Sequence, residues 1–181
     1  MTRVSINLRD FDIKGNVLDI SAKGSFVIPE ILETYTKDKI DKEFLNCEDE
    51  IACTTSIYNS AVAILSFNSI TGEKRLKKIL LDIKRSLKNE GKFLICDLNV
   101  GAFSVPRRYT IMLKLPGEKI MKMKYTLGIN PFRIKFKEML DIVEKCGFKV
   151  MKKKVDKGVY YIECLNQQEA KNENNISITK L

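Results

Sequence analysis

The sequence of 181 residues contains no histidine and no tryptophan. The absence of histidine excludes the Ser-His-Asp and Cys-His arrangements of nucleophilic enzymes, because both use an imidazole as the general base. It also disfavours zinc and non-haem iron sites, in which histidine is a frequent ligand. We therefore expect no metal site, and any catalysis by this chain has to proceed without imidazole.

Long apolar runs are absent too. No run approaches the roughly 18–20 apolar residues that a membrane-spanning helix needs. Residues 1–15 are polar and charged, and they lack the apolar core of a signal peptide. These two absences predict a cytoplasmic protein that has no membrane partner.

Cysteine is present, but without the pattern of a metal site or a disulfide framework. The cysteines number five, an odd count, and include no Cys-x-x-Cys pair. They are Cys47, Cys53, Cys96, Cys146 and Cys164. We interpret them as reduced residues of the core, where a free thiol behaves as a small apolar side chain.

Positive charge is abundant, and the formal net charge is +9. Two interpretations remain open. A composition rich in lysine, isoleucine and asparagine accounts for the charge without any function. A functional basic face would instead attract nucleic acid or another anionic partner.

Three largely apolar runs predict buried parallel strands. They are residues 16–21, 61–67 and 92–97. The second is continuous and rich in β-branched residues, which is typical of a central strand that is covered on both faces.

Two helices are predicted between these strands. Ser25 is a candidate N-cap for a helix over residues 25–36. Residues 73–88 carry an apolar stripe with a period of 3.6 residues, formed by Leu76, Ile79, Leu80, Ile83 and Leu87. Gly91 is the predicted left-handed residue that ends this second helix.

Residues 98–131 interrupt the alternation. They hold three of the four prolines and three of the nine glycines, together with six lysines and arginines. A segment of this length between a strand and a helix is usually functional or mobile. After it, helical period returns at residue 136, residues 148–155 and 159–165 predict a β-hairpin, and the polar tail 167–181 is predicted to be disordered.

The order of the elements predicts an α/β fold with a Rossmann-like, mainly parallel sheet, helices on both faces and a C-terminal antiparallel hairpin strand. Residues 1–166 would form one domain, in which residues 98–131 are an insertion on the substrate side. We expect residues 1–15 to pack on the edge of this domain as a leader.

At this point the sequence resembles the class I S-adenosylmethionine-dependent methyltransferases, over about residues 15–166. The run 17–20 with its following loop resembles the first strand and cofactor loop of the family. The phrase RSLKNEGKFLICD at residues 85–97 is similar to the family's R-x-L-K-P-G-G followed by an apolar strand. The C-terminal helix, Gly147-Phe148 and the hairpin are the third similar piece.

The resemblance implies S-adenosylmethionine as the cofactor. It implies cofactor-binding roles for Asp19, Ser21, Gly24, Ser66, Phe67 and Asn68. It also places the methyl acceptor against residues 98–131, where Arg107 and Arg108 would bind an anionic acceptor such as RNA or a phosphorylated metabolite.

The chain departs from the family's pattern in its first half. Ser21, Lys23 and Ser25 stand where the family has three glycines, and Gly24 is one residue out of step. An ammonium at Lys23 would repel a sulfonium cation by about 1 kcal/mol at ~4 Å in water and by about 4 kcal/mol at a dielectric constant of 20. Lys23 either points to solvent or occupies the cofactor's place.

The segment between the first helix and the strand at residue 61 is also short. It leaves room for one strand where the family has two. The acidic residue that binds ribose in the family has three candidates here, Asp38, Asp41 and Glu43, none of which follows a clear apolar strand.

Three functions remain open on this sequence. The first is a methyltransferase, since methyl transfer depends on positioning and needs no histidine. The second is a catalytically inactive methyltransferase-like binding or scaffold protein with a basic partner surface. The third is a protein that binds an anionic nucleotide where Ser21, Lys23 and Ser25 open a helix.

Overall fold

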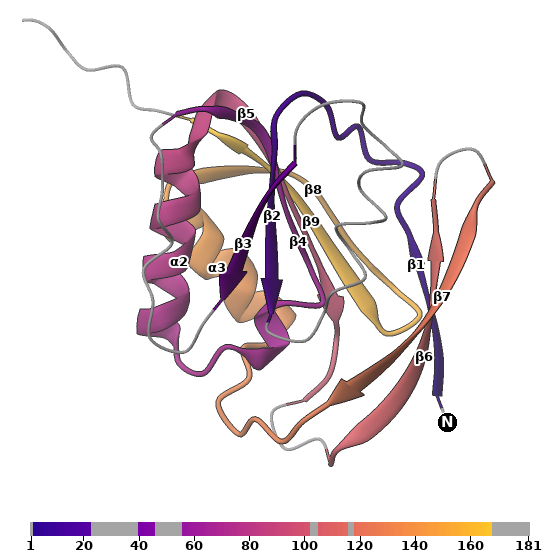
Figure 1. The fold of residues 1–181 in the computed structure, drawn as a ribbon. Helices are drawn as coiled ribbons and strands as arrows, with labels where there is room; N and C mark the ends of the chain where they lie inside the picture. The colour runs from indigo at the N-terminus through magenta and orange to yellow at the C-terminus, as the bar shows by residue number, and fades with distance from the viewer. Residues whose placement is uncertain (1, 23–39, 46–55, 102–104, 116–117, 168–181) are drawn as a thin grey trace, which may run out of the picture.

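A computed structural model describes residues 2–22, 40–45, 56–101, 105–115 and 118–167, with residues 21–22 and 40–45 described by their backbone alone (Figure 1). Several predictions lie outside these residues. They are the helix over 25–36, the tail from 168 on, and the positions of Lys23, Gly24, Ser25, Asp38, Cys47 and Cys53.

A six-stranded sheet forms the centre of the molecule, in the order β3-β2-β4-β5-β9-β8. Its strands are β2 (Val17–Ala22), β3 (Ile40–Leu45), β4 (Tyr58–Ile64), β5 (Leu87–Leu98), β8 (Phe148–Asp156) and β9 (Val159–Asn166). The first four strands of this sheet in sequence are mutually parallel, and β9 runs antiparallel to both of its neighbours. The large sheet is therefore mixed, with parallel strands followed by the antiparallel β8–β9 hairpin.

The central strands are buried because both of their faces are covered. Along β4, Ala61 and Ala63 belong to one hydrophobic core, and Val62 and Ile64 belong to another. A strand between two cores needs apolar side chains on both faces, which explains the continuous apolar run in the sequence.

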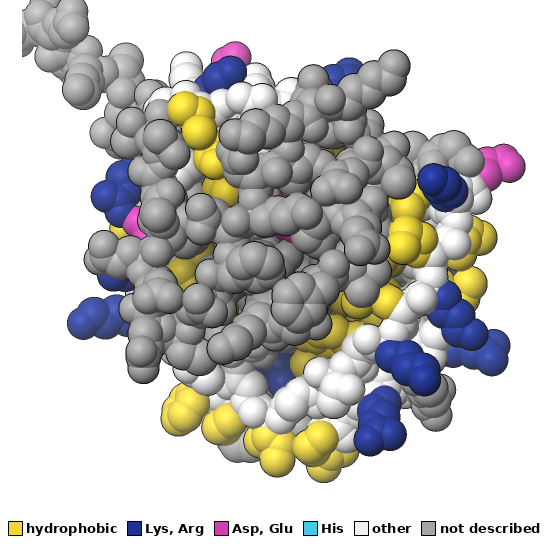
Figure 2. Space-filling model, viewed as in Figure 1, with side chains coloured by type: hydrophobic (Ala, Val, Ile, Leu, Met, Phe, Trp, Pro, Cys, Tyr) yellow, Lys and Arg dark blue, Asp and Glu magenta, His cyan; other side chains and the backbone are white. Residues whose placement is uncertain are grey.

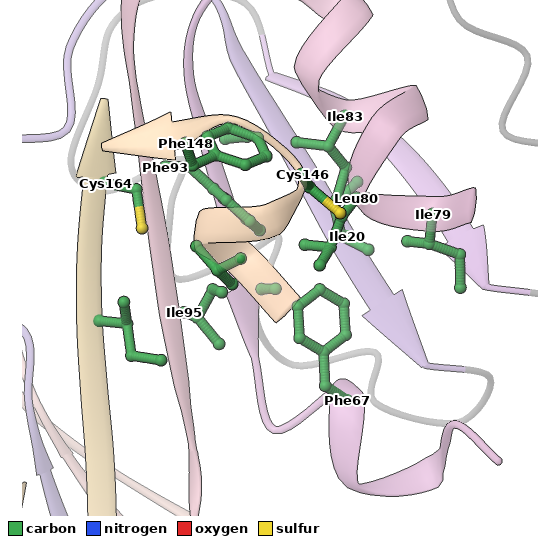
Figure 3. Packing of buried hydrophobic residues seen from close by; sticks show 14 of the residues in the cluster. Ile20, Phe67, Ile79, Leu80, Ile83, Phe93, Ile95, Cys146, Phe148 and Cys164 are labelled. Carbon is green, nitrogen blue, oxygen red and sulfur yellow. The ribbon is translucent and has the colours of Figure 1, made fainter. Parts of the chain in front are cut away.

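Helices cover one face of this sheet. The 3-10 turn η1 (Phe67–Ser69) and the helices α2 (Glu73–Ser86) and α3 (Phe136–Lys145) pack there against alternate residues of β2, β4, β5 and β9. Figure 3 shows the two helices meeting around Leu80, Ile83 and Cys146, with Phe93 and Phe148 to the left of these residues. Neither described helix is long and apolar enough to cross a membrane.

The predicted left-handed end of α2 at Gly91 is wrong. The helix ends at Ser86, and Leu87 is already extended, with φ −77° and ψ 140°. The residue with positive φ is Glu90, at 60°, where the ladder between β4 and β5 shifts its register. Glycine is required at 91 for a different reason, because a Cβ there would lie 2.9 Å from the carbonyl oxygen of Lys88.

A second sheet covers the opposite face. It consists of β1 (Thr2–Asn7), β6 (Arg107–Lys114) and β7 (Ile120–Leu127) in the order β1-β6-β7. Its inward side chains, among them Ile6, Ile111 and Leu113, pack on Val62, Leu94 and Cys96 of the large sheet. Figure 1 shows this small sheet on the side away from α2 and α3.

Among the described residues, helices cover one face of the large sheet, and the strands of the second sheet cover the other. The prediction of helices on both faces is therefore not confirmed, and the predicted helix over residues 25–36 lies outside the described residues. The sequence predicted that residues 1–15 pack on the edge of the domain as a leader, and it did not foresee the strand β1 within them, which pairs with β6 in parallel from Thr2↔Tyr109 to Asn7↔Lys114. The period-2 burial of Val4, Ile6 and Leu8 explains why this segment becomes a strand.

Two sequence predictions, a single strand between β2 and β4 and a C-terminal hairpin, agree with the structure. One strand, β3, lies between β2 and β4 among the described residues. The β8–β9 hairpin turns at Lys157 and Gly158, with φ values of 46° and 84°. Two successive positive φ values are typical of the tight turn that matches the twist of paired strands.

Candidate functional site

The carboxyl ends of β2, β4 and β5 meet at one edge of the large sheet, beside η1. Ser66 opens the turn that follows β4, and its hydroxyl lies within hydrogen-bond distance of the carbonyl oxygens of Ile20 (2.7 Å) and Ile64 (3.0 Å). The side chain is fully buried. Ser66 thus ties the end of β2 to the end of β4, and this use occupies its hydroxyl proton.

Asp97 organises the rest of this turn. One of its carboxylate oxygens, Oδ2, accepts the backbone N–H groups of Phe67 and Asn68, each at 2.9 Å. The other, Oδ1, accepts the N–H of Leu98 at 2.8 Å and a short hydrogen bond from the side-chain amide of Asn68. Burial raises the pKa of Asp97 to about 6, although these hydrogen bonds favour its ionised form.

The insertion holds the same turn from the other side. The side-chain amide of Asn130 donates to the carbonyl oxygens of Asn68 and Ile70, each at 3.0 Å. The hydroxyl of Tyr125, on β7, donates to the carbonyl oxygen of Leu65 at 3.3 Å. The turn is therefore held by both sheets at once, which restricts its motion.

Arg133 closes the base of the insertion. Its buried guanidinium donates to the carbonyl oxygens of Gly101 (2.9 Å) and Gly128 (2.8 Å), which lie at the two ends of the inserted segment. Sequence reasoning did not single out Asp97, Tyr125, Asn130 or Arg133 as site residues. The one available signal was an aspartate directly at the end of an apolar strand.

The structure separates the roles of the predicted turn residues. The ring of Phe67 packs in the helix-side core against the edge of Phe93, with ring centres 6.3 Å apart (Figure 3). Asn68 is buried, and its amide bonds to Asp97 and to the carbonyl oxygen of Leu98. Both side chains are therefore already engaged within the protein, as are the backbone N–H groups of Phe67 and Asn68.

Asp19 and Ser21 both lie on β2. Asp19 is fully buried and level with Val62 of β4, on the face that Val17 also occupies. Ser21 is two residues nearer the carboxyl edge and pairs with Phe44 of β3. Gly24, the remaining predicted cofactor residue, lies outside the described part of the chain.

The candidate ribose acids differ in their register. Asp41 pairs with Leu18, and Glu43 pairs with Ile20, whose carbonyl oxygen is close to the hydroxyl of Ser66. Glu43 is therefore the nearer of the two to the carboxyl edge. Asp38 falls outside the described residues.

Arg107 and Arg108 are exposed at the start of β6, opposite Leu127 and Thr126 at the end of β7. Figure 1 places this end of the second sheet at the same end of the molecule as η1. Within the described residues, no cluster of three or more acidic or cysteine side chains is arranged to hold a metal ion.

A pocket of about 170 Å³ lies elsewhere, between the loop after β1 and the β8–β9 edge. It is lined by Phe11, Tyr161, Lys152 and Lys154, among others, and contains none of the predicted site residues. The ring of Phe11 stacks on Tyr161, and Lys152 is paired with Glu163 at 3.4 Å.

No protein-family model and no curated protein sequence matches this chain. Solved structures do match, over most of its length. A methyltransferase from Methanosarcina mazei aligns with 88% of this chain and 95% of its own, at 13% identity and a TM-score of 0.55. Another from Clostridium acetobutylicum aligns with 85% of each chain, at 11% identity and a TM-score of 0.51.

This chain has the fold of the class I S-adenosylmethionine-dependent methyltransferases. A glycopeptide N-methyltransferase complexed with sinefungin has the fold too, at 13% identity and a TM-score of 0.51, with 84% of this chain and 87% of that one covered. At such identities the likeness concerns the fold. Within this methyltransferase fold, Ser66, Asn68 and Asp97 lie at the carboxyl ends of the parallel strands, where open α/β sheets bind their ligands.

Proposed function

We propose that this chain binds S-adenosylmethionine at the carboxyl edge formed by β2, η1 and β5 and transfers its methyl group to an anionic acceptor. The observation that carries the proposal is the methyltransferase fold with a buried, hydrogen-bonded turn at this edge. One similar structure, the glycopeptide N-methyltransferase, was solved with S-adenosylhomocysteine and with sinefungin.

The residues at the edge fit a cationic cofactor. Two aspartates are fully buried here, Asp19 midway along β2 and Asp97 at the carboxyl end of β5. Carboxylates in a low-dielectric environment favour a nearby positive charge such as a sulfonium. In this proposal Asp19, Ser21, Gly24 and the backbone of Ser66, Phe67 and Asn68 hold the cofactor, and Glu43 is the first candidate for its ribose.

The protein's part in the reaction would be positioning. When bound, the cofactor supplies an activated methyl group for in-line displacement, so orientation of the acceptor accounts for much of the acceleration. Asp97 and Asn130 act as positioning residues, because they fix the turn without reaching the acceptor. Arg107 and Arg108 are the proposed acceptor ligands, and RNA and a phosphorylated metabolite share the anionic group that they would bind.

Calorimetric titration with S-adenosylmethionine and S-adenosylhomocysteine tests the proposal. We expect both to bind and, at a hundred times the dissociation constant, to stabilise the fold by about 2.7 kcal/mol. If millimolar ligand produced no heat of binding and no thermal stabilisation, cofactor binding would be refuted.

Two substitutions of Lys23 separate its charge from its size. Lys23→Gln removes the charge and keeps much of the bulk, whereas Lys23→Gly removes both. If the ammonium faces the sulfonium, both variants should improve the affinity for S-adenosylmethionine about fivefold or more relative to the uncharged thioether S-adenosylhomocysteine. An unchanged ratio means that Lys23 points away from the ligand.

A non-catalytic binding protein is the second candidate. This candidate is supported by the hydrogen bonds that the polar groups of the turn already make within the protein. Ser66 donates to the carbonyl oxygen of Ile20, Asn68 donates to that of Leu98, and Asp97 accepts from the backbone of the turn. This candidate predicts no binding of either cofactor form. Adding ATP to the same titrations tests the third possibility, an anionic nucleotide at this edge.

A further inference from the structure

The outer face of the β1-β6-β7 sheet carries a set of cations that no part of the proposed cofactor site uses. In each strand alternate residues pack inward, including Val4, Ile6, Ile111, Leu113, Met123 and Leu127. The residues between them face outward, because successive side chains of a strand point to opposite faces.

The strand register brings the outward residues into rows. Arg3, Thr110 and Lys124 form one row, and Ser5, Met112 and Lys122 form the next. Arg108 pairs with Thr126, and Lys114 pairs with Ile120, on the two sides of these rows. We call the five cations Arg3, Arg108, Lys114, Lys122 and Lys124 the basic face.

No acidic residue balances the basic face from within the sheet. The three strands contain no aspartate or glutamate, and Glu118 lies in the turn between β6 and β7. Among the described residues, none of the five cations forms an ion pair. Figure 2 shows basic side chains along the right-hand side of the molecule, where Figure 1 places the small sheet.

Such an arrangement is unfavourable in the isolated protein. Neighbouring strands lie about 4.8 Å apart, and residues i and i+2 of one strand lie about 7 Å apart. No two of the five cations are direct partners in the register, so they repel one another as second neighbours, such as Lys122 and Lys124 at i and i+2 of β7. A ligand with repeated negative charges removes this repulsion, whereas a single anion would neutralise only one or two of the five positions.

Exposed apolar side chains lie where this sheet approaches the carboxyl edge. Phe132, which follows β7, is 69% exposed, and Ile129 is 72% exposed. The backbone N–H of Phe132 donates to the side-chain oxygen of Asn130 at 3.0 Å, and Asn130 also binds the turn after β4. An exposed ring beside a basic surface is the pairing with which proteins bind the bases and phosphates of single strands.

We propose that the basic face binds the phosphodiester backbone of a single-stranded nucleic acid and that Phe132 stacks on a base where the strand reaches the carboxyl edge. The proposal does not depend on methyl transfer, because binding is measured without cofactor. A lipid surface fits less well, since the cations Arg3, Lys122 and Lys124 hold exposed positions in the middle of the face. The exposed apolar side chains, Ile120, Ile129 and Phe132, lie at or beyond its two ends.

Fluorescence anisotropy with a labelled single-stranded RNA of mixed sequence tests the proposal, at salt concentrations from about 50 to about 200 mM. The face variant combines Arg3→Gln, Arg108→Gln, Lys122→Gln and Lys124→Gln. The control variant combines Lys74→Gln, Lys137→Gln, Lys145→Gln and Lys149→Gln, four exposed lysines of α2, α3 and β8. Both variants lose the same net charge, so overall attraction changes equally.

The face variant should bind at least tenfold more weakly at the higher salt concentration. Each phosphate contact on a single strand contributes about 0.7 to the slope of log K against log salt, so the slope should fall by about 3. The control variant should keep most of the wild-type affinity and most of the wild-type slope. Phe132→Ala should weaken binding about fivefold or more without changing the slope, and Phe132→Tyr should restore it.

Three results would overturn the proposal. The first is that the wild-type protein does not bind the RNA. The second is that the face variant and the control variant weaken RNA binding equally, which assigns the effect to diffuse charge. The third is that the face variant loses binding to phosphatidylserine vesicles but not to RNA, which assigns the face to a lipid surface. Circular dichroism of each variant confirms that it is folded.

Discussion

Asp97 is fully buried, and its pKa of about 6 is raised from the usual 3.8 mainly by desolvation. The folded protein therefore keeps the proton of Asp97 over a pH range in which the unfolded chain has released it. The contribution of this group to stability is fully present below about pH 4 and decreases as the pH rises to about 6. The difference between the two pKa values corresponds to about 3 kcal/mol.

Replacement of Asp97 by asparagine removes this titration. We expect the free energy of unfolding of the wild type, minus that of Asp97→Asn, to be about 2.4 kcal/mol larger at pH 4 than at pH 7. Urea unfolding at several pH values, followed by circular dichroism, measures this difference.

Asp12→Asn is the control for that series. Asp12 is exposed, and hydrogen bonds from Lys14 and then Lys92 lower its pKa, so its contribution has the opposite sign and is lost as the pH falls. A difference between wild type and Asp97→Asn that stays constant with pH would contradict the raised pKa of Asp97.

The three described cysteines, Cys96, Cys146 and Cys164, are buried thiols without disulfide partners. Burial raises the pKa of Cys96 and Cys146, and that of Cys164 to about 12, so very little thiolate is present near neutral pH. This agrees with the interpretation of these three as reduced core residues.

A thiol reagent should therefore distinguish the folded from the unfolded chain. In a Cys47→Ser/Cys53→Ser variant at pH 8, we expect a disulfide reagent to label none of the remaining cysteines within minutes and all of them in urea. Fast labelling of the folded variant would show that one of these thiols is accessible and activated.

The site could be predicted from the sequence only where its residues follow a strand directly. The apolar run 61–67 predicts the strand β4, and Ser66 and Asn68 lie in the turn just after it. Their partners were not found, because Asp97 and Asn130 are 29 and 62 residues away from Asn68. A hydrogen bond between such distant segments leaves no local pattern.

At the scale of elements, helix α2 shows that an apolar stripe in the sequence predicts which face of a helix is buried. Leu76, Leu80 and Ile83 are fully buried against the sheet, and the neighbouring Leu81 is 46% exposed. The 3.6-residue period distinguishes these positions although the residue type is the same.

Leu80 and Leu81 provide a matched pair for measurement. Leu80→Ala should destabilise the fold by about 2–5 kcal/mol, because it removes buried atoms and leaves a cavity between α2, α3 and the sheet. Leu81→Ala should stay within about 0.5 kcal/mol of the wild type. Equal losses for the two variants would mean that α2 is rotated relative to the sheet.

The strands of the second sheet were missed for a physical reason. In β7 the outward positions hold Lys122, Lys124 and Thr126, so the segment is strongly charged, and prolines and glycines flank it and β6. Its alternation of buried and exposed residues is nevertheless that of a half-buried strand. β1 pairs with a strand about a hundred residues later in the chain, and no local signal predicts such a partner.

For the whole molecule, the second sheet means that the large sheet lies between a helical layer and a strand layer. In the described part of the chain, nineteen buried apolar residues form the core between the two sheets, and they come from the N-terminal segment, the central strands, the insertion and β9. The parallel order of the large sheet could be predicted from the alternation of strands and helices. The second layer could not, because it depends on pairing between the two least regular parts of the sequence.

If this layer is an integral part of the fold, a change in β1 must destabilise the whole protein. Ile6 is fully buried between the sheets, and Ser5, its neighbour, faces the other side. Ile6→Ala should lower the free energy of unfolding by about 2–5 kcal/mol in a single cooperative transition, whereas Ser5→Ala should change it by less than about 0.5 kcal/mol. Circular dichroism in urea is the suitable measurement, since the chain has no tryptophan to report by fluorescence. An early, separate transition in Ile6→Ala would instead mean that the small sheet unfolds independently. The large sheet and its helices would then remain folded after the basic face is lost.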